Sequence, residues 1–314
     1  MKKIILSSLL SLFVCFSTLA QQHPNYTQYT LNRYALNPAV AGLEACTQVS
    51  FGHRKQWVGF EGAPSHYFAS FNTRLNKGSK FPKNFHGIGA YFSNDRNGFT
   101  DYSIIKFSYT YHIKLWKNYH LSVGLFGGIH QQKTSFRDIR IQNKSLDPTV
   151  FENDKTNLIY PEVSPGGFIY NKNFFLGLSL FQQYPARIKE IGTKENRLSP
   201  HYFFTGGYRL RGRDIHFSPS YLFSFAPFSS PTLDITLTVD YKQKISLALG
   251  SKYLNSAYAT LQLKMTQRIT LGYSYEYALN EINKVAPTTH EIVILFNSCH
   301  IDKIKQKILC PAYQ

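Results

Sequence analysis

The residues that could catalyse a reaction or hold a metal ion are scattered along this chain. His290 and Glu291 begin like the H-E-x-x-H motif of zinc proteases, but Ile292, Val293 and Ile294 follow, so the second histidine is missing and the local pattern is that of a strand. The other histidines occur singly, without the spacing of metal ligands, and the sequence contains neither a G-x-S-x-G motif nor a P-loop. The sequence therefore predicts no cofactor, no metal and no enzymatic activity.

The cysteines form no redox or metal motif either. Beyond the N-terminal export signal described next, the chain has Cys46, Cys299 and Cys310, and no two of them make a C-x-x-C pair. Three cysteines permit at most one internal disulfide and leave one thiol over. We expect Cys310 to pair with either Cys46 or Cys299, because the compartment that an exported chain reaches permits disulfides.

Residues 1–20 are typical of a secretory signal peptide. Two lysines precede the apolar residues 4–16, and small residues lie where signal peptidase reads the chain, at Thr18 and Ala20. The apolar stretch is too short to span a bilayer as a helix, and every later apolar run is interrupted by a polar residue. We expect a mature chain that begins at Gln21 and resides in the outer membrane as a β-barrel.

The composition agrees with a barrel and restricts the partners. With 25 Phe and 22 Tyr, the aromatic share is 16%, yet the mean hydropathy is only -0.26. Barrels combine these properties because only one face of each strand meets lipid. The formal net charge is +17, but export argues against nucleic acid as a partner. The basic residues then belong to solvated turns and lumen, or they attract anionic lipid head groups or acidic partner proteins.

Segments of about ten residues with alternating character follow one another from Thr47 onward, which is the length that a tilted membrane strand needs. In the clearest segment, residues 269–277, apolar and aromatic side chains alternate with Thr, Gly, Ser and Glu, so one face suits lipid and the other a lumen. The sequence predicts fourteen antiparallel strands, an even number as single-chain bacterial barrels need. Their expected starts are Thr47, Ser65, His86, Asp101, Tyr119, Pro165, Asn173, His201, Asp214, Thr232, Lys244, Ser256, Arg268 and Thr289.

The connections between these strands alternate in length, as short periplasmic turns and longer external loops do. Tight turns are expected at residues 116–118, 171–173, 211–213, 242–244 and 266–268, and long loops at 133–164, 183–200 and 278–288. Two connections break the rule, because residues 75–85 are long for a turn and residues 254–255 are short for a loop. A secreted β-sandwich is the alternative fold, but fourteen strands without a domain break fit it less well.

The chain thus divides into a signal peptide (1–20), an N-terminal lead-in or plug segment (21–46), a transmembrane β-barrel (47–297) and a C-terminal periplasmic tail (298–314). The N-terminal segment is turn-rich around Asn37-Pro38, and the tail alternates Lys and Ile in a pattern compatible with one or two helical turns. With an even strand count, both segments enter from the periplasm, and we expect them to bind partners or to close the lumen. The alternative is that both are frayed chain ends.

One ordered set of residues near the N-terminus resembles the opening signature of the PorP/SprF family of Bacteroidetes outer-membrane proteins. The matching positions are Tyr29, Asn32, Asn37, Pro38, Gly42, Arg54, Gln56, Trp57 and Pro64. The resemblance implies a role in the type IX secretion system, with secreted surface proteins such as gliding adhesins, or peptidoglycan-linked periplasmic components, as partners. Most of these positions suit structural roles: Asn37-Pro38 and Gly42 suit a fixed bend, and Trp57 suits an interfacial girdle or a plug contact.

Three functions remain open at this stage. The leading hypothesis is a non-catalytic type IX secretion barrel in outer-membrane lipid that helps export or anchor a secreted surface protein. A porin-like channel is the second, because charged residues fall on predicted lumen faces, namely Lys106, Asp234, Lys264 and Glu276. A lipid-modifying barrel enzyme is the third, because a Ser-His site can form across neighbouring strands without a sequence motif.

Overall fold

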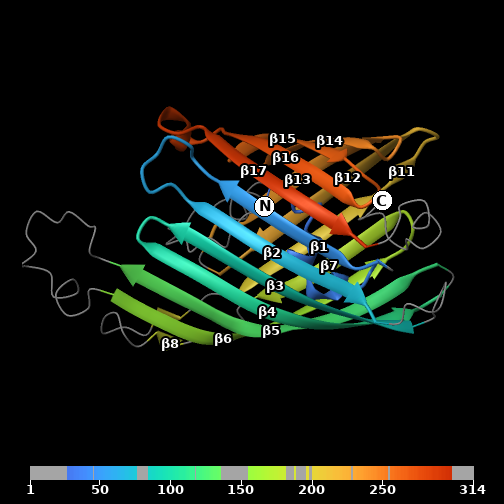
Figure 1. Cartoon of the computed structure of the whole chain (residues 1–314), viewed down its shortest axis with the longest axis horizontal. Helices are drawn as coiled ribbons and strands as arrows, with labels where there is room; N and C mark the ends of the chain where they lie inside the picture. Colours follow the sequence, from blue (N-terminus) through green and yellow to red (C-terminus); the bar gives the residue numbers. More distant parts are fainter. Residues whose placement is uncertain are drawn as a thin grey trace, which may run out of the picture.

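A computed structural model describes residues 27–44, 46–75, 84–116, 118–135, 155–181, 187–188, 196–197, 200–227, 229–253 and 255–298. The signal peptide and the tail from residue 299 onward lie outside these residues. In the described part, the chain forms a closed antiparallel β-barrel with a short segment inside it (Figure 1). Among the described helices, none is long and apolar enough to cross a membrane.

The barrel wall consists of strands that follow one another in chain order. They are β1 (Gln48–Lys55), β2 (Ser65–Arg74), β3 (Asn84–Asn97), β4 (Thr100–Lys114), β5 (His120–Ser135), β6 (Lys155–Tyr170), β7 (Phe174–Phe181), β10 (His201–Tyr208), β11 (Leu210–Arg211), β12 (Ile215–Phe225), β13 (Thr232–Tyr241), β14 (Ile245–Lys252), β15 (Ser256–Lys264), β16 (Ile269–Ala278) and β17 (Thr288–Asn297). The strands β8 (Arg187–Ile188) and β9 (Asn196–Arg197) pair only with each other.

Hydrogen bonds close this wall at both of its seams. β1 pairs with β17 from Gln48↔Asn297 to Lys55↔His290, and β10 pairs with β12. Because β11 continues β10 beyond Arg209, the fifteen segments of the sheet make fourteen barrel strands in the described chain. The predicted all-β barrel of about fourteen antiparallel strands is therefore confirmed.

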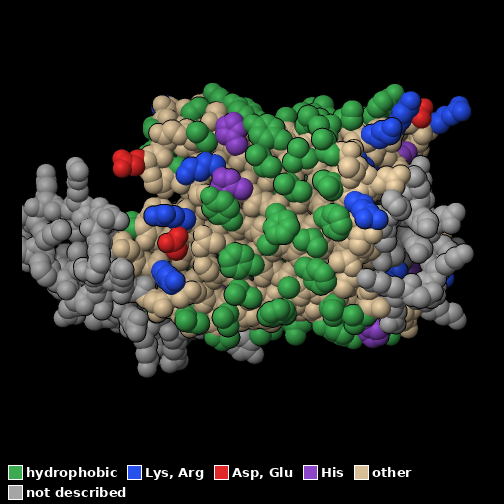
Figure 2. Space-filling model, viewed as in Figure 1, with side chains coloured by type: hydrophobic (Ala, Val, Ile, Leu, Met, Phe, Trp, Pro, Cys, Tyr) green, Lys and Arg blue, Asp and Glu red, His purple; other side chains and the backbone are tan. Residues whose placement is uncertain are grey.

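Each strand presents one face to the outside and one to the interior, as the alternation predicts. On β16, Tyr273 and Tyr275 are exposed on the outside, whereas Ser274 and Glu276 are buried on the inside. Figure 2 shows the result on one face of the molecule, where apolar side chains cover the middle of the barrel and charged side chains gather toward its two ends.

The two ends of the barrel differ in their connections. Short turns join β6 to β7, β13 to β14 and β15 to β16 at one end, which we call the turn end. The opposite end, which we call the loop end, carries the connection between β5 and β6 and the helix η3 (Glu281–Lys284). In Figure 1, the loop end lies at the left and the turn end at the right.

One strand differs clearly from its prediction. β6 begins at Lys155 and not near Pro165, and β5 extends to Ser135, so the expected loop over residues 133–164 is too long. β5 and β6 pair along their whole length, whereas β6 pairs with β7 only from Gly166 to Tyr170. Among the described residues, the loop-end part of β6 therefore has a hydrogen-bonded neighbour on one side only.

Candidate functional site

The candidate site is the barrel interior, which the N-terminal segment of residues 27–44 fills. It contains the helix α2 (Arg33–Leu36) and the 3-10 helix η1 (Pro38–Val40), and its apolar side chains pack against Phe126 and Phe168 of the wall. Because the aromatic and aliphatic side chains of the segment are buried there, the hydrophobic core of this barrel lies inside the lumen and includes Tyr34.

The segment runs from the loop end to the turn end. Thr27 contacts Arg54 and Glu276, which lie one and two residues before the loop ends of β1 and β16. At the other end, the carbonyl oxygens of Gly42 and Leu43 accept hydrogen bonds from Arg74, the last residue of β2. The segment therefore spans the lumen between the two ends of the barrel, and the side of the membrane from which it enters stays a prediction.

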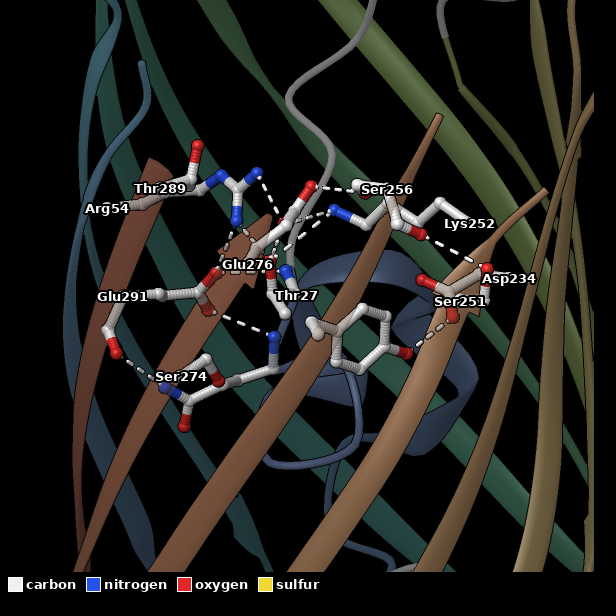
Figure 3. Close-up of polar contacts among 12 residues, drawn as sticks. Thr27, Arg54, Asp234, Ser251, Lys252, Ser256, Ser274, Glu276, Thr289 and Glu291 are labelled. Carbon is white, nitrogen blue, oxygen red and sulfur yellow. Dashed lines mark hydrogen bonds and ion pairs between the residues drawn. The ribbon is translucent and has the colours of Figure 1, made fainter. Parts of the chain in front are cut away.

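A cluster of buried charges holds the start of the segment (Figure 3). The two carboxylate oxygens of Glu291 accept the backbone N–H groups of Thr27 and Gln28, at 2.9 and 3.1 Å. The side-chain amide of Gln28 donates to the backbone oxygen of Glu291 at 2.9 Å. Arg54 pairs with Glu276 at 3.0 Å and with Glu291 at 3.2 Å. The first residues of the segment are thus bound by both backbone and side chain.

The same cluster continues toward the next strands of the wall. Lys252 of β14 contacts Glu276 at 2.9 Å, and Ser256 of β15 donates to the other oxygen of Glu276 at 2.7 Å. On β13, Asp234 accepts a hydrogen bond from Tyr258. Each carboxylate of Glu276 and Glu291 therefore has a cationic partner, which offsets the cost of burying charge inside the barrel.

Tyrosines of the segment contact opposite parts of the wall. The hydroxyl of Tyr29 lies 3.0 Å from Ser220 Oγ of β12 and 3.1 Å from Thr236 Oγ1 of β13. The hydroxyl of Tyr34 lies 2.9 Å from Ser108 Oγ of β4. Because β4 and β13 are far apart in the strand order, these two side chains tie the segment to both sides of the barrel.

The Asn37-Pro38 bend lies where β6 and β7 separate. Asn37 Nδ2 donates to the carbonyl oxygens of Gly167 and Leu178, each at 3.1 Å, and Asn37 Oδ1 accepts the N–H of Ala39. The oxygen of Pro38 accepts the hydroxyl of Thr110 of β4 at 2.6 Å. This bend is consequently fixed by three strands of the wall.

Glycines of the wall and of the segment allow this close approach. Gly42 has a φ of +73°, and a Cβ added there would lie 2.6 Å from the Cα of Gly87 on β3. A Cβ at Gly124 of β5 would lie 2.7 Å from the backbone of Pro38 and Ala39. A side chain at any of these three glycines would therefore collide with backbone atoms.

The structure separates the nine signature residues into two sets. Tyr29, Asn37, Pro38, Gly42 and Arg54 make the interior contacts described above. Asn32, also of the interior set, accepts a hydrogen bond from Ser70. Gln56, Trp57 and Pro64 instead shape the loop between β1 and β2, where the N–H of Gln56 donates to the oxygen of Pro64 at 3.0 Å.

Trp57 lies at the beginning of that loop and not in a strand. Its backbone is left-handed, with a φ of 49°, and its N–H donates to the hydroxyl of Thr289 of β17 at 3.3 Å. The signature thus combines residues that fix the segment with residues that join the first strand to the last at the loop end.

Sequence reasoning missed the wall residues that bind the segment. The sequence places Glu291 in a strand and Glu276 on an inward face, but it gives neither of them a partner. The available signal was the period of two, because it places both carboxylates, with Arg54 and Lys252, on the inward faces of their strands. It could not show that these four strand ends converge on Thr27.

A second group of buried charges lies on β4, β5 and β6. Lys106 contacts Glu162 at 3.6 Å, His130 contacts the other oxygen of Glu162, and Ser164 donates to Glu162 at 2.5 Å. Since Glu162 lies between Ser164 and His130, these residues do not form a nucleophile and its base. Among the described residues, no group of three or more His, Cys, Asp or Glu side chains could hold a metal ion.

Cys46, at the turn end just before β1, is disulfide-bonded. With three cysteines and one bond, this does not fit the expected pairing of Cys310 with Cys299. The partner of Cys46 lies outside the described residues, so its pairing with Cys310 stays a prediction.

Residues 18–296 match the family model described as type IX secretion system membrane protein PorP/SprF. The match covers more than half of the chain and includes both the interior segment and the barrel strands. No curated protein matches the chain.

The solved structures that match the chain include a toluene transporter and a FadL homologue. The toluene transporter TbuX of Ralstonia pickettii has a TM-score of 0.53 at 9% identity, with 86% of this chain and 94% of that chain covered. A Pseudomonas aeruginosa FadL homologue has a TM-score of 0.47 at 9% identity, with 89% and 94% covered. At these identities, the similarity to TbuX concerns the barrel fold alone.

Proposed function

Since the chain belongs to the family of type IX secretion system membrane proteins PorP/SprF, we propose that it is a non-catalytic outer-membrane barrel that helps export or anchor a secreted surface protein of that system. The partner reaches it through the loop end, and periplasmic components of the system reach it through the turn end. A cleavable signal peptide over residues 1–20 delivers the chain to this location.

One observation carries the proposal: the interior is filled by a segment of the chain itself. Residues 27–44 are held by an ion-pair cluster at one end, by Arg74 at the other and by hydrogen bonds to several strands between them. A lumen occupied in this way suits a protein that presents its loops and ends to partners, and it does not suit a path for solutes.

A porin-like channel is the first rival. It was suggested by four charged residues on inward faces, and three of them, Lys106, Asp234 and Glu276, are buried in contact with other residues of the barrel. A porin uses such residues to line a water-filled channel, which leaves them hydrated. The observed burial favours the binding role.

A lipid-modifying enzyme is the second rival, and one contact speaks for it. His53 Nε2 of β1 lies 3.2 Å from Ser65 Oγ of β2, and both side chains are on the outward face near the loop end. A Ser-His-Asp site also needs a group that orients the second ring nitrogen. The described residues provide no hydrogen bond to His53 Nδ1. We therefore expect a Ser65→Ala strain to keep an unchanged membrane lipid profile; a lost lipid modification would support the enzyme.

The proposal is tested in the native host by deleting the gene and by pulling down a tagged copy in mild detergent. We expect type IX components and a secreted protein to co-purify, and we expect the same secreted protein to disappear from the cell surface in the deletion strain. Normal surface display of every secreted type IX protein in that strain would contradict the proposal.

A further inference from the structure

A row of polar and basic side chains crosses the outward face of the barrel near the loop end. We call it the outer basic band. The strand register places its members side by side, because Lys55 pairs with Ser65, Ser65 with Arg96, Arg96 with Asp101, and Asp101 with Lys133. The row ends at His290 of β17 on one side and at Asn157 of β6 on the other.

A second polar row lies one step closer to the middle of the barrel. On each strand, its member lies two residues away from the member of the outer basic band, toward the middle of the barrel. The members of this second row are His53, Tyr67, Asn94, Ser103 and Gln131. His53 stacks on Tyr67 with ring centroids 4.2 Å apart, and Asn94 donates to Ser103 at 3.0 Å. Through these contacts, polar side chains of the second row hold one another in place next to the basic side chains of the band.

The outward positions below these two rows are apolar. They are Phe51, Phe92, Ile105 and Ile129, all exposed on the lipid-facing side. Figure 2 shows this border on its left side, where a line of basic, histidine and acidic side chains runs along the edge of the apolar area. The band therefore lies at the level where acyl chains give way to head groups.

Within the described part of the chain, the band carries a net positive charge. Lys55, Arg96 and Lys133 form no ion pair in the described part of the chain, and the band itself contains a single carboxylate, Asp101. Neighbouring strands are about 4.8 Å apart, so the three cations, on alternate strands, are spaced roughly 10 Å apart.

Among the described residues, the rest of the wall carries no such band. At the loop end, the outward residues are Tyr277 of β16, Tyr253 in the hairpin between β14 and β15, and Ala257 of β15. Aromatic residues of this kind are the general feature of barrel girdles and carry no charge. In the part of the wall that the structure describes, the outer basic band is thus confined to the strands from β17 through β1 to β6.

We propose that the outer basic band binds the phosphate groups of an anionic glycolipid in the outer leaflet, whose acyl chains lie on the apolar surface below it. The leaflet follows from the topology, because short turns mark the periplasmic end of such barrels and the band is at the opposite end. Basic side chains near a membrane surface attract anionic head groups. The binding site is separate from the interior segment and does not depend on the secretion role.

The test measures lipid binding by native mass spectrometry of the purified, delipidated barrel. The probes are bis-phosphorylated lipid A, dephosphorylated lipid A and phosphatidylglycerol. The band variant is Lys55→Gln with Arg96→Gln and Lys133→Gln, and the matched control, Lys172→Gln with Lys242→Gln and Lys244→Gln, removes three exposed lysines at the turn end. Heat-modifiable gel mobility confirms that each variant is folded.

We expect the wild-type barrel and the control variant to bind bis-phosphorylated lipid A equally, and the band variant to bind it roughly a hundredfold more weakly, since each basic side chain contributes about a factor of five. Dephosphorylated lipid A and phosphatidylglycerol should bind the wild type more weakly than the phosphorylated glycolipid does. Equal binding by the band variant, an equal loss in the control, or equal affinity for phosphatidylglycerol would overturn the proposal.

Discussion

Gly124 and Gly127 lie three residues apart on β5, and only one of them faces the interior segment. A Cβ at Gly124 would lie 2.7 Å from Pro38 and Ala39, whereas a Cβ at Gly127 would meet nothing within 4 Å. We predict that Gly124→Ala loosens the bend and destabilises the protein by about 1–3 kcal/mol, as overpacking does, and that Gly127→Ala has almost no effect. Protease cleavage of the segment in folded barrels measures this, and equal cleavage of the two variants would show that the bend does not pack against β5.

Arg54 is the residue on which the charge cluster depends most. It contacts both Glu276 and Glu291, so removing it leaves two buried carboxylates with fewer partners. We predict that Arg54→Ala destabilises the folded barrel by about 3–5 kcal/mol, the usual cost of breaking a buried pair. The control is Lys284→Ala, which breaks a fully exposed pair with Glu281 and should have almost no effect. Urea titration of both variants in lipid vesicles measures their unfolding midpoints, and similar midpoints would contradict this role for Arg54.

For single residues, the sequence signature identifies positions that matter but not the residues that they contact. The signature includes Tyr29, Asn37 and Arg54, and all three prove to be buried. Their partners Ser220, Leu178 and Glu276 are more than a hundred residues away along the chain. Such contacts depend on how the barrel closes, which local patterns do not specify.

The strands were largely predictable because a membrane barrel repeats one simple rule. On β14, every second residue is outward and exposed, including Leu249 near the middle and Ser251 at the loop end. We predict that Leu249→Arg destabilises the barrel by about 2–4 kcal/mol and Ser251→Arg by about 0–1 kcal/mol, because the cost of a charge rises toward the bilayer midplane. Folded yield in lipid vesicles measures both, and equal yields would mean that β14 does not cross the membrane as assigned.

The inward faces were less predictable than the outward ones. Thr236 faces inward as the alternation predicts, and it is buried in contact with the hydroxyls of Tyr29 and Tyr258. An arginine at position 236 would displace the segment. The sequence pattern assigns the correct face to this residue but cannot reveal that the lumen behind it is filled.

The prediction began β6 near Pro165, whereas the strand begins at Lys155 and contains both Pro161 and Pro165. Backbone groups alternate between the two sides of a strand, and the N–H of Asn171 donates toward β7. Odd-numbered residues such as Pro161 and Pro165 therefore have their nitrogens on the β7 side, where no described residue pairs with this part of β6. Proline is tolerated at such an edge because no ladder hydrogen bond is lost.

The orientation of the whole barrel rests on the contrast between its loop end and its turn end. We predict that a cysteine at Asn97, at the loop end of β3, reacts with a membrane-impermeant maleimide on intact cells. A cysteine at Lys172, in the turn between β6 and β7, should react only after the outer membrane is opened. The reverse labelling pattern would mean that the barrel has the opposite orientation, with the outer basic band in the periplasmic leaflet.

The central claim concerns the closed interior, and the conductance of the purified protein in planar bilayers tests it most directly. We predict no steady current through the wild-type barrel, because residues 27–44 fill the lumen from the loop end to the turn end. In the Arg54→Ala variant the segment is held less firmly, so this variant should show brief openings. These openings serve as the control that inserted barrels are detected in the measurement. A large and steady conductance of the wild type would contradict the account and would identify the protein as a channel.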